Sequence, residues 1–523
     1  MKRSKLNILK YSILAFVVIH TTSCTKDFAE ENRNPYAATE EEMNRLPKGG
    51  AQLLALQKLI VPEQENSYQM ILDLGINGYA GYTTQWMDFR SDYPVYNPRN
   101  AWVDYIYDDT FPKIYSSYFD IYRLTKGDKK ELPLALATIL RVAISHNFTD
   151  IFGPVPYSKM KAGNLNTDYD SQEEVYKAMC EDLKESVLTL KAVDINNRQY
   201  ESFDLIYDGD MSKWVKYANS LLLRMSIRMA SKLPTLAKEY AEFAVQNGVI
   251  TSNSDNAQLP TIDNPLFKVT HNWGNSAINA EITEYMNAFS DPRREKYFTA
   301  VSNRTAGRQY FGVRNGTVAP TTYNLANYSK PNITQNSPIC WITASEVAFL
   351  KAEGVLNGWS MGGAAGDLYT QGVNLSCEQW GASPGTYLQN TAKRGSLTDQ
   401  LTTAMNVNFS SQITVSWADA GGDKEKQLSK IITQKWIALY PYGAVEAWSE
   451  WRRTGYPNMI PAAANNSGGA VSNITQVGGK DVGGMRRLPY STKESTTSPA
   501  VMQKALTLLG GSDNGGTNLW WSK

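Results

Sequence analysis

The 523-residue sequence contains little histidine and little cysteine, three residues of the first and four of the second. Three histidines are too few to favour a metal site built from several of them, and the cysteines share no short metal-ligand spacing. We therefore expect no metal and no other cofactor. Three of the cysteines, Cys180, Cys340 and Cys377, lie well inside the chain. We interpret them as mostly buried thiols. The alternative is that two of them form one disulfide.

Strong net charge and long apolar runs are also missing. The formal net charge is +1, and no basic patch indicates nucleic-acid binding. Beyond residue 23 no 18 consecutive residues are apolar, so we expect no membrane span there. The composition, 42% apolar and 20% charged, is that of a globular protein with a large buried core.

The first 24 residues have the order of a lipoprotein signal. Basic residues at positions 2, 3 and 5 precede an apolar run over residues 8–19, and small residues then lead to Cys24. Cleavage before Cys24 leaves a cysteine that acyl chains can modify, and two or more chains anchor a protein stably. The run is too short for a bilayer-spanning helix. A secreted protein with a chance cysteine is the remaining alternative.

A polar segment follows the lipidation site. Residues 25–31 are basic and then acidic, a pattern that looks like the surface-export signal of some outer-membrane lipoproteins. We therefore expect a signal peptide over residues 1–23, a lipidated flexible tether over 24–47 and a single domain over 48–523. The predicted location is the outer membrane, with the domain facing the cell exterior and the lipid as its membrane contact.

Hydrophobic periodicity predicts a mainly α protein. Capping boxes at Ser171–Glu174 and Thr343–Glu346 mark two of the helix starts. We expect a loop over residues 147–157 and a short hairpin around 310–318. The predicted helices are 51–60, 133–144, 171–190, 212–229, 236–249, 343–358, 367–380 and 428–451, the last interrupted near Pro441.

These helices group into a body, which is accompanied by an irregular lobe. Small residues such as Ala352, Gly354, Ala438 and Ala444 suit close crossings of paired helices, as in tetratricopeptide hairpins. The predicted fold is therefore tetratricopeptide-like helical hairpins packed with a loop-rich lobe. The body covers about 48–250, 341–381 and 427–455. The lobe covers about 251–340, 382–426 and 456–523.

Several short motifs follow one another in a specific order. They are Thr149–Tyr157 after Arg141, Tyr207–Asp210 before Trp214 and Arg224, Ser345–Val347 with Lys351–Glu353, Gln434–Trp436, Glu446–Trp448 with Arg452–Pro457, and Arg486–Tyr490. Together they resemble the SusD/RagB family of outer-membrane nutrient-binding lipoproteins, from Cys24 to Trp521. The resemblance departs after Tyr490, where residues 496–499 replace an Asn-containing strand.

The resemblance implies a fold, a partner and a ligand. It implies four tetratricopeptide-like helical pairs beside a loop-rich lobe. It also implies a SusC-type TonB-dependent outer-membrane barrel, which a protein of this kind covers as a hinged lid. Similar proteins capture oligosaccharides or peptides and pass them to that barrel for import. The prediction is therefore a cell-surface nutrient-binding lipoprotein that is not an enzyme.

Two aromatic stretches are the candidate ligand-binding regions. Flat rings among amides and carboxylates stack on sugars and also grip peptide side chains, so the sequence leaves oligosaccharide and peptide open. The alternative is that both stretches pack in the core or against the barrel. The predicted contacts are Tyr82, Trp86, Asp88, Tyr93 and Asn97 in the first stretch and Trp273, Asn275 and Tyr310 in the second.

Two further function classes stay open as alternatives. The sequence contains no motif of serine hydrolases, zinc proteases or phosphate-binding loops. A surface glycoside hydrolase, however, needs only two carboxyl groups about 5 Å apart, and a surface adhesin needs no small-molecule site. We interpret Gly153–Pro156 as a structural turn, and Arg452 and Arg453 beside Trp448 as structural side chains.

Overall fold

The computed structural model describes residues 46–85, 92–160, 167–302, 304, 307–317, 325–399 and 401–522. The chain divides into two units, Met1–Lys48 and Gly49–Lys523, and the description that follows concerns the second. Helices dominate this unit and its strands are short. The predicted mainly α fold is therefore confirmed.

Most of the longer helices lie in the regions where periodicity predicts them. The α-helices of eight or more residues in the described part of the chain are α4 (Gly50–Gln57), α7 (Asn100–Leu124), α8 (Leu132–Phe152), α9 (Gln172–Lys191), α10 (Met211–Met229), α11 (Pro234–Asn247), α13 (Ala280–Ala288), α15 (Ala344–Leu356), α16 (Ala365–Gln379), α17 (Lys424–Leu439), α18 (Ala444–Thr454) and α20 (Pro499–Leu509). Shorter helices are α5 (Glu65–Tyr68), α6 (Asn77–Tyr79), α12 (Pro265–Phe267), α14 (Arg294–Tyr297) and α19 (Thr492–Thr497). Two π-helical segments are η1 (Gln69–Ile76) and η5 (Lys268–Asn272).

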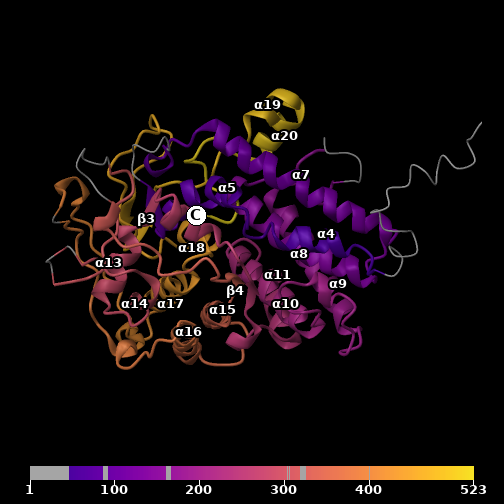
Figure 1. Cartoon of the computed structure of the whole chain (residues 1–523), viewed down its shortest axis with the longest axis horizontal. Helices are drawn as coiled ribbons and strands as arrows, with labels where there is room; N and C mark the ends of the chain where they lie inside the picture. Colours follow the sequence, from indigo (N-terminus) through magenta and orange to yellow (C-terminus); the bar gives the residue numbers. More distant parts are fainter. Residues whose placement is uncertain are drawn as a thin grey trace, which may run out of the picture. The chain divides into compact units, whose positions relative to one another are not determined.

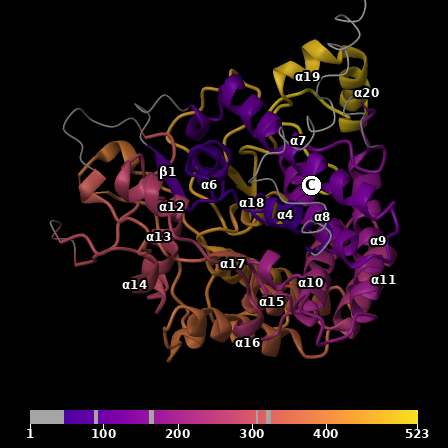
Figure 2. The same ribbon diagram turned by 45° about the vertical axis from the view of Figure 1, so that its right-hand side comes forward.

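Successive helices pair side by side. Helix α8 packs on α9, α10 on α11, α15 on α16 and α17 on α18, and α8 to α11 lie next to one another in both ribbon views (Figure 1, Figure 2). The close approach of α15 and α16 depends on Gly372, because a Cβ there would lie 2.7 Å from the ring of Phe349. In both views α13 and α14 lie on the side away from α9 and α11.

The two predicted capping boxes differ in the structure. At the start of α9, the Ser171 hydroxyl accepts from the backbone N–H of Glu174, and the Glu174 carboxylate accepts from the N–H of Ser171. At the start of α15, Thr343 accepts from the N–H of Glu346 at 3.3 Å, but the Glu346 carboxylate binds Arg224 instead. The second box is therefore only half formed, because a buried ion pair takes its carboxylate.

Helix α8 is longer than predicted. It continues to Phe152, so the predicted loop was wrong for residues 147–152. Polar groups in this stretch find partners in the core; for example, Asp150 accepts from the Tyr176 hydroxyl at 2.6 Å. Gly153, with φ 100°, ends the helix. Helix α8 is long and apolar enough to cross a membrane, but 94% of the apolar stretch is buried in the fold, so it serves as a core helix.

The strands form three antiparallel pairs in the described part of the chain. They are β1 (Thr83–Gln85) with β3 (Ser276–Ile278), β2 (Ala257–Leu259) with β4 (Ile339–Ile342), and β5 (Thr475–Val477) with β6 (Lys480–Val482). The hairpin predicted around 310–318 does not form among residues 307–317. Val313 makes an isolated parallel bridge with Asn279 instead, so this segment docks at the end of β3.

Helix α18 carries buried charges. Arg453 pairs with Glu450 at 2.8 Å and with Glu353 at 2.6 Å. The guanidinium of Arg452 lies 3.7 Å from the centroid of the Trp448 ring. Both arginines are buried, which confirms that they are structural side chains.

Candidate functional site

The pair of β1 and β3 joins the two aromatic stretches that the sequence singles out. Thr83 lies opposite Ile278, and Gln85 lies opposite Ser276. Asn275 and Trp273 come just before Ser276 in the chain. Gln85 in the first stretch and Ser276, which directly follows the second stretch's Asn275, therefore lie opposite each other at one end of this two-stranded ribbon. The sequence contains no signal for this pairing.

A buried carboxylate fixes the position of the ribbon. Asp73 in η1 accepts hydrogen bonds from the hydroxyls of Ser276 at 2.6 Å and Thr83 at 3.1 Å. The amide of Gln85 donates to the same carboxylate at 3.4 Å. Burial raises the pKa of Asp73 to about 6, and the hydrogen bonds offset only part of this effect. One side chain thus connects the π-helix to both strands.

Tyr82 and Tyr93 lie in the core. Tyr82 has no exposed surface; its hydroxyl donates to the carbonyl oxygen of Trp436 at 2.6 Å, and the two rings stack. Tyr93 is 1% exposed and stacks on Trp102. A side chain without exposed surface does not reach a ligand, so core packing, the alternative interpretation of this stretch, describes both tyrosines.

Of three other predicted contacts, one does not lie on an open surface and two are not described. Tyr310 is 8% exposed; Arg294 lies over its ring at 5.6 Å, and Phe298 contacts it from another side. Tyr310 therefore packs mainly against the protein. Trp86 and Asp88 lie outside the described residues, and their role stays a prediction.

Three predicted contacts reach the surface. Trp273 is 37% exposed, Asn97 is exposed, and Asn275 is half-buried. Trp273 follows η5, in which His271 stacks on the ring of Phe267 at 4.5 Å. An exposed indole is a surface on which a sugar ring or a peptide side chain can stack, and the amide of Asn275 follows two residues later in the chain. We call Trp273 and Asn275 the Trp273 patch.

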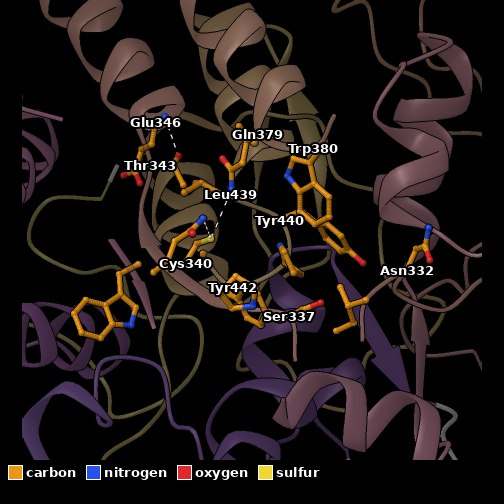
Figure 3. A pocket seen from close by; sticks show the side chains of 17 residues that line it. Asn332, Ser337, Cys340, Thr343, Glu346, Gln379, Trp380, Leu439, Tyr440 and Tyr442 are labelled. Atoms are coloured by element: carbon orange, nitrogen blue, oxygen red, sulfur yellow. Dashed lines mark hydrogen bonds between the residues drawn. The ribbon is translucent and has the colours of Figure 1, made fainter. Parts of the chain in front are cut away.

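A separate cavity of about 170 Å³ lies between the β2–β4 pair, the end of α16 and the loop that joins α17 to α18 (Figure 3). Its walls include four aromatic side chains, and its polar lining consists of amides, hydroxyls, a thiol and the carboxylate of Glu346. The aromatic residues are Trp341, Trp380, Tyr440 and Tyr442; the polar ones include Gln258, Asn332, Ser337, Cys340, Thr343 and Gln379. The buried Tyr82 contacts this cavity's wall, because its ring lies edge-on to Tyr440 at 5.5 Å.

Comparison with known proteins gives one family. The model of the SusD-like family, described as Susd and RagB outer membrane lipoprotein, matches residues 30–522. The chain belongs to the SusD-like family. A SusD homologue from Bacteroides thetaiotaomicron is 37% identical to it, with a TM-score of 0.83 over 91% of this chain and 99% of that chain. Another from Bacteroides uniformis is 36% identical, with the same TM-score and coverage.

A third similar structure is described by the ligand that its protein binds. It is a chitin-binding SusD homologue from Flavobacterium johnsoniae, 32% identical, with a TM-score of 0.83 over 91% of this chain and 98% of that chain. The comparison with curated proteins finds no match.

Membership of the SusD-like family makes this chain an outer-membrane lipoprotein of the nutrient-uptake type. Cys24 precedes both the matched and the described residues, so its lipidation stays a prediction. Cys180, Cys340 and Cys377 are free thiols, so no disulfide joins any two of them. Among the described residues no group of three or more His, Cys, Asp or Glu side chains is arranged to hold a metal ion.

Proposed function

We propose that this SusD-like protein binds an oligosaccharide at the outer face of the outer membrane and delivers it to a SusC-type TonB-dependent transporter. Family membership supports nutrient binding in that membrane. The chitin-binding description of a relative that is 32% identical favours a glycan over a peptide. Both the surface orientation and the partner belong to this proposal.

The exposed indole of Trp273 is the observation that carries the binding step. Among the predicted aromatic contacts that the structure describes, Trp273 is the one that is exposed, whereas Tyr82, Tyr93 and Tyr310 are buried. The neighbouring amide of Asn275 can exchange hydrogen bonds with sugar hydroxyls. A flat apolar face beside a polar group matches the two surfaces of a pyranose ring.

Calorimetry with chitin-derived oligosaccharides tests this step. We expect binding to the purified protein, and an affinity about tenfold or more lower in Trp273→Ala, because the loss of a stacked ring costs on the order of 1–3 kcal/mol. Tyr122→Ala is the matched control, since Tyr122 is an aromatic residue that is 42% exposed on another element, α7. Equal affinities of the two variants would remove the Trp273 patch from the site. Binding of peptides alone would overturn the glycan assignment, and hydrolysis of the oligosaccharide would favour the glycosidase alternative.

Co-purification tests the delivery step. We expect a tagged form of the protein, extracted from outer membranes in mild detergent, to bring down a TonB-dependent barrel in stoichiometric amount. Growth on the bound oligosaccharide should then require both proteins. Glycan binding without any such barrel would leave a surface receptor and contradict delivery.

A further inference from the structure

A groove beside the start of α5 opens to the surface. Its volume is about 390 Å³, and its lining comes from the segment between α4 and α5, from α5, η1 and α7, and from the loop before α12. An engineered protein cavity of about 150 Å³ holds benzene, so the groove has room for a sugar ring. Ile262 on its lining is 86% exposed, and the side chain of Lys113 is 53% exposed, so a ligand can reach both. We call it the α5–α7 groove.

Lys268 connects this groove to the Trp273 patch. Its ammonium group lies 2.9 Å from the carboxylate of Asp263 and 3.2 Å from that of Glu65, and both of these acids line the groove. The backbone carbonyl oxygen of Lys268 accepts the N–H of Trp273 at 2.9 Å. One residue thus spans the distance between the patch and the groove, so a chain of several sugar units is long enough to contact both.

The charged side chains that line the groove are all paired with a group of opposite charge. The pairs are Lys58–Glu63 at 2.8 Å, Lys113–Asp109 at 2.7 Å, Lys268–Asp263 at 2.9 Å and Lys268–Glu65 at 3.2 Å. An ionic ligand therefore finds no unpaired counter-charge on the lining, which favours a neutral ligand. Each ammonium group keeps further donors and each carboxylate keeps further acceptor positions. A sugar hydroxyl can bind to either kind of group, because it both donates and accepts.

Two side chains of the groove offer contacts that the fold does not use. Thr110 is 8% exposed, and its hydroxyl forms no hydrogen bond with any described residue. The hydroxyl oxygen is not one of the fully buried unpaired atoms, so it is reached from the groove that Thr110 lines. Ile262 presents apolar surface at the same groove. A sugar ring carries hydroxyls at its edge and C–H groups on its faces, so one ring can bind the hydroxyl of Thr110 and cover Ile262.

We propose that the α5–α7 groove is a second subsite for the glycan, and that the protein therefore selects neutral oligosaccharides long enough to occupy the groove and the Trp273 patch together. This inference rests on the glycan binding proposed above. One unit of the chain stacks on the indole of Trp273. A unit further along lies in the groove, bonds to the hydroxyl of Thr110 and covers Ile262. A short oligosaccharide occupies one subsite and lacks the contacts of the other.

Calorimetry on the purified protein with chitobiose and chitohexaose tests this second subsite. Both oligosaccharides are neutral, and we expect chitohexaose to bind about tenfold or more tightly than chitobiose. Ile262→Ser should lower the affinity for chitohexaose about tenfold, because an apolar contact is lost, and should leave the affinity for chitobiose unchanged. Thr110→Val removes the hydroxyl at nearly constant volume, and it should weaken the binding of chitohexaose alone, by several-fold.

Ile195→Ser is the matched control, since Ile195 is 67% exposed in the loop after α9 and does not line the groove. Trp273→Ala should weaken the binding of both oligosaccharides, and circular dichroism checks the fold of every variant. If both groove variants retain the parent's affinity for chitohexaose while Trp273→Ala loses it, the second subsite is overturned and the proposed function stands. Equal losses for the two lengths would also overturn the subsite. A parent protein that binds neither oligosaccharide would overturn the glycan assignment together with the subsite.

Discussion

At the scale of single residues, the buried charged side chains each need a partner of opposite charge. Arg453 on α18 satisfies Glu353 on α15 and Glu450 on its own helix. Lys435 on α17 and Arg228 on α10 add further pairs to Glu450. A buried pair is costly to break rather than strongly stabilising, because a lone charge stays behind in a medium of low dielectric constant.

Arg453→Ala tests this statement. The change leaves the Glu353 carboxylate, which is 3% exposed, without its positively charged partner Arg453. We therefore expect the free energy of unfolding to fall by about 3–5 kcal/mol. Lys177→Ala removes an exposed partner of Glu173 on α9, and its cost should be about 0.5 kcal/mol or less. Urea denaturation measures both values. Similar losses in the two variants would show that the buried pairs act like surface pairs.

Asp73 makes the stability of the ribbon depend on pH. Burial raises its pKa from 3.8 to about 6, so the folded protein holds this proton over a pH range in which the unfolded chain has lost it. Stability must then fall as the pH rises from about 4 to about 6 and stay constant above that. The gap of about two pKa units corresponds to about 3 kcal/mol.

Asp73→Asn should remove this contribution, because the amide oxygen still accepts from Ser276 but no longer titrates. Urea denaturation at several pH values should show that the difference between the variant and the parent changes by about 3 kcal/mol between pH 4 and 7. Asp367→Asn, at an exposed position in α16, serves as the control and should leave the slope intact. A parallel pH profile of Asp73→Asn and the parent would contradict the raised pKa.

At the scale of elements, glycines decide where helices end. Gly153 and Gly248 close α8 and α11 with φ values of 100° and 97°, which L side chains rarely adopt. A Cβ at Gly153 would lie 3.1 Å from Leu519 and 3.2 Å from Leu509, whereas one at Gly248 would meet nothing within 4 Å. An alanine at either position strains the backbone, but only an alanine at Gly153 also crowds neighbouring side chains. Comparison of the two substitutions therefore separates backbone strain from crowding.

We expect both Gly153→Ala and Gly248→Ala to lower stability by the backbone cost, about 1–3 kcal/mol. Gly153→Ala should lose about 1 kcal/mol more, because the new methyl group crowds two leucines of the C-terminal region. Thermal and urea denaturation of both variants provide the comparison. If Gly248→Ala lowered stability more than Gly153→Ala, the contacts of the new methyl group with the two leucines would make no measurable contribution to the loss.

The sequence predicts the elements whose boundaries have local signals. The capping box predicted at Ser171 is confirmed, the helix predicted from residue 212 starts at Met211 behind the N-cap Asp210, and the break between α17 and α18 falls at Pro441. Helix α7 was missed. No helix was predicted between residues 60 and 133, although α7 spans Asn100–Leu124; it follows directly on the aromatic stretch interpreted as ligand-binding, yet Tyr107, Phe111 and other rings of α7 pack inward. Aromatic residues serve a core and a binding face equally well, so composition alone does not separate the two.

Of the two candidate sites, the sequence indicated the Trp273 patch but not the cavity. Trp273 was found because it is an aromatic residue within a polar, irregular stretch, and it is exposed. The cavity was missed because its walls come from segments that lie far apart in the chain, around Gln258, Cys340, Gln379 and Tyr440. No single segment contains a motif for it. Only the packing of β2, β4, α16 and α17 creates the space.

At the scale of the whole molecule, the folded unit and its attachment to the membrane are separate questions. Membership of the SusD-like family places the protein in the outer membrane, and helix α8, which is apolar enough to span a membrane, is buried in the fold. Attachment through lipid on Cys24 would leave that helix in place. The tether predicted over residues 24–47 would reach roughly 25 Å as a flexible coil, enough for the domain to move over the proposed transporter while it stays anchored.

Labelling of growing cells with radioactive palmitate tests this attachment. We expect the parent protein to carry label and to sediment with membranes, because two or more acyl chains hold a protein there stably. Cys24→Ala should lose the label and most of the membrane association, while Cys340→Ala should keep both, since Cys340 lies on an internal cavity. Label that persists in Cys24→Ala would place the lipid elsewhere, and a labelled protein that protease added to intact cells fails to degrade would face the periplasm. In that orientation a ligand from outside would have to cross the outer membrane before capture, so delivery to an outer-membrane transporter would have no purpose.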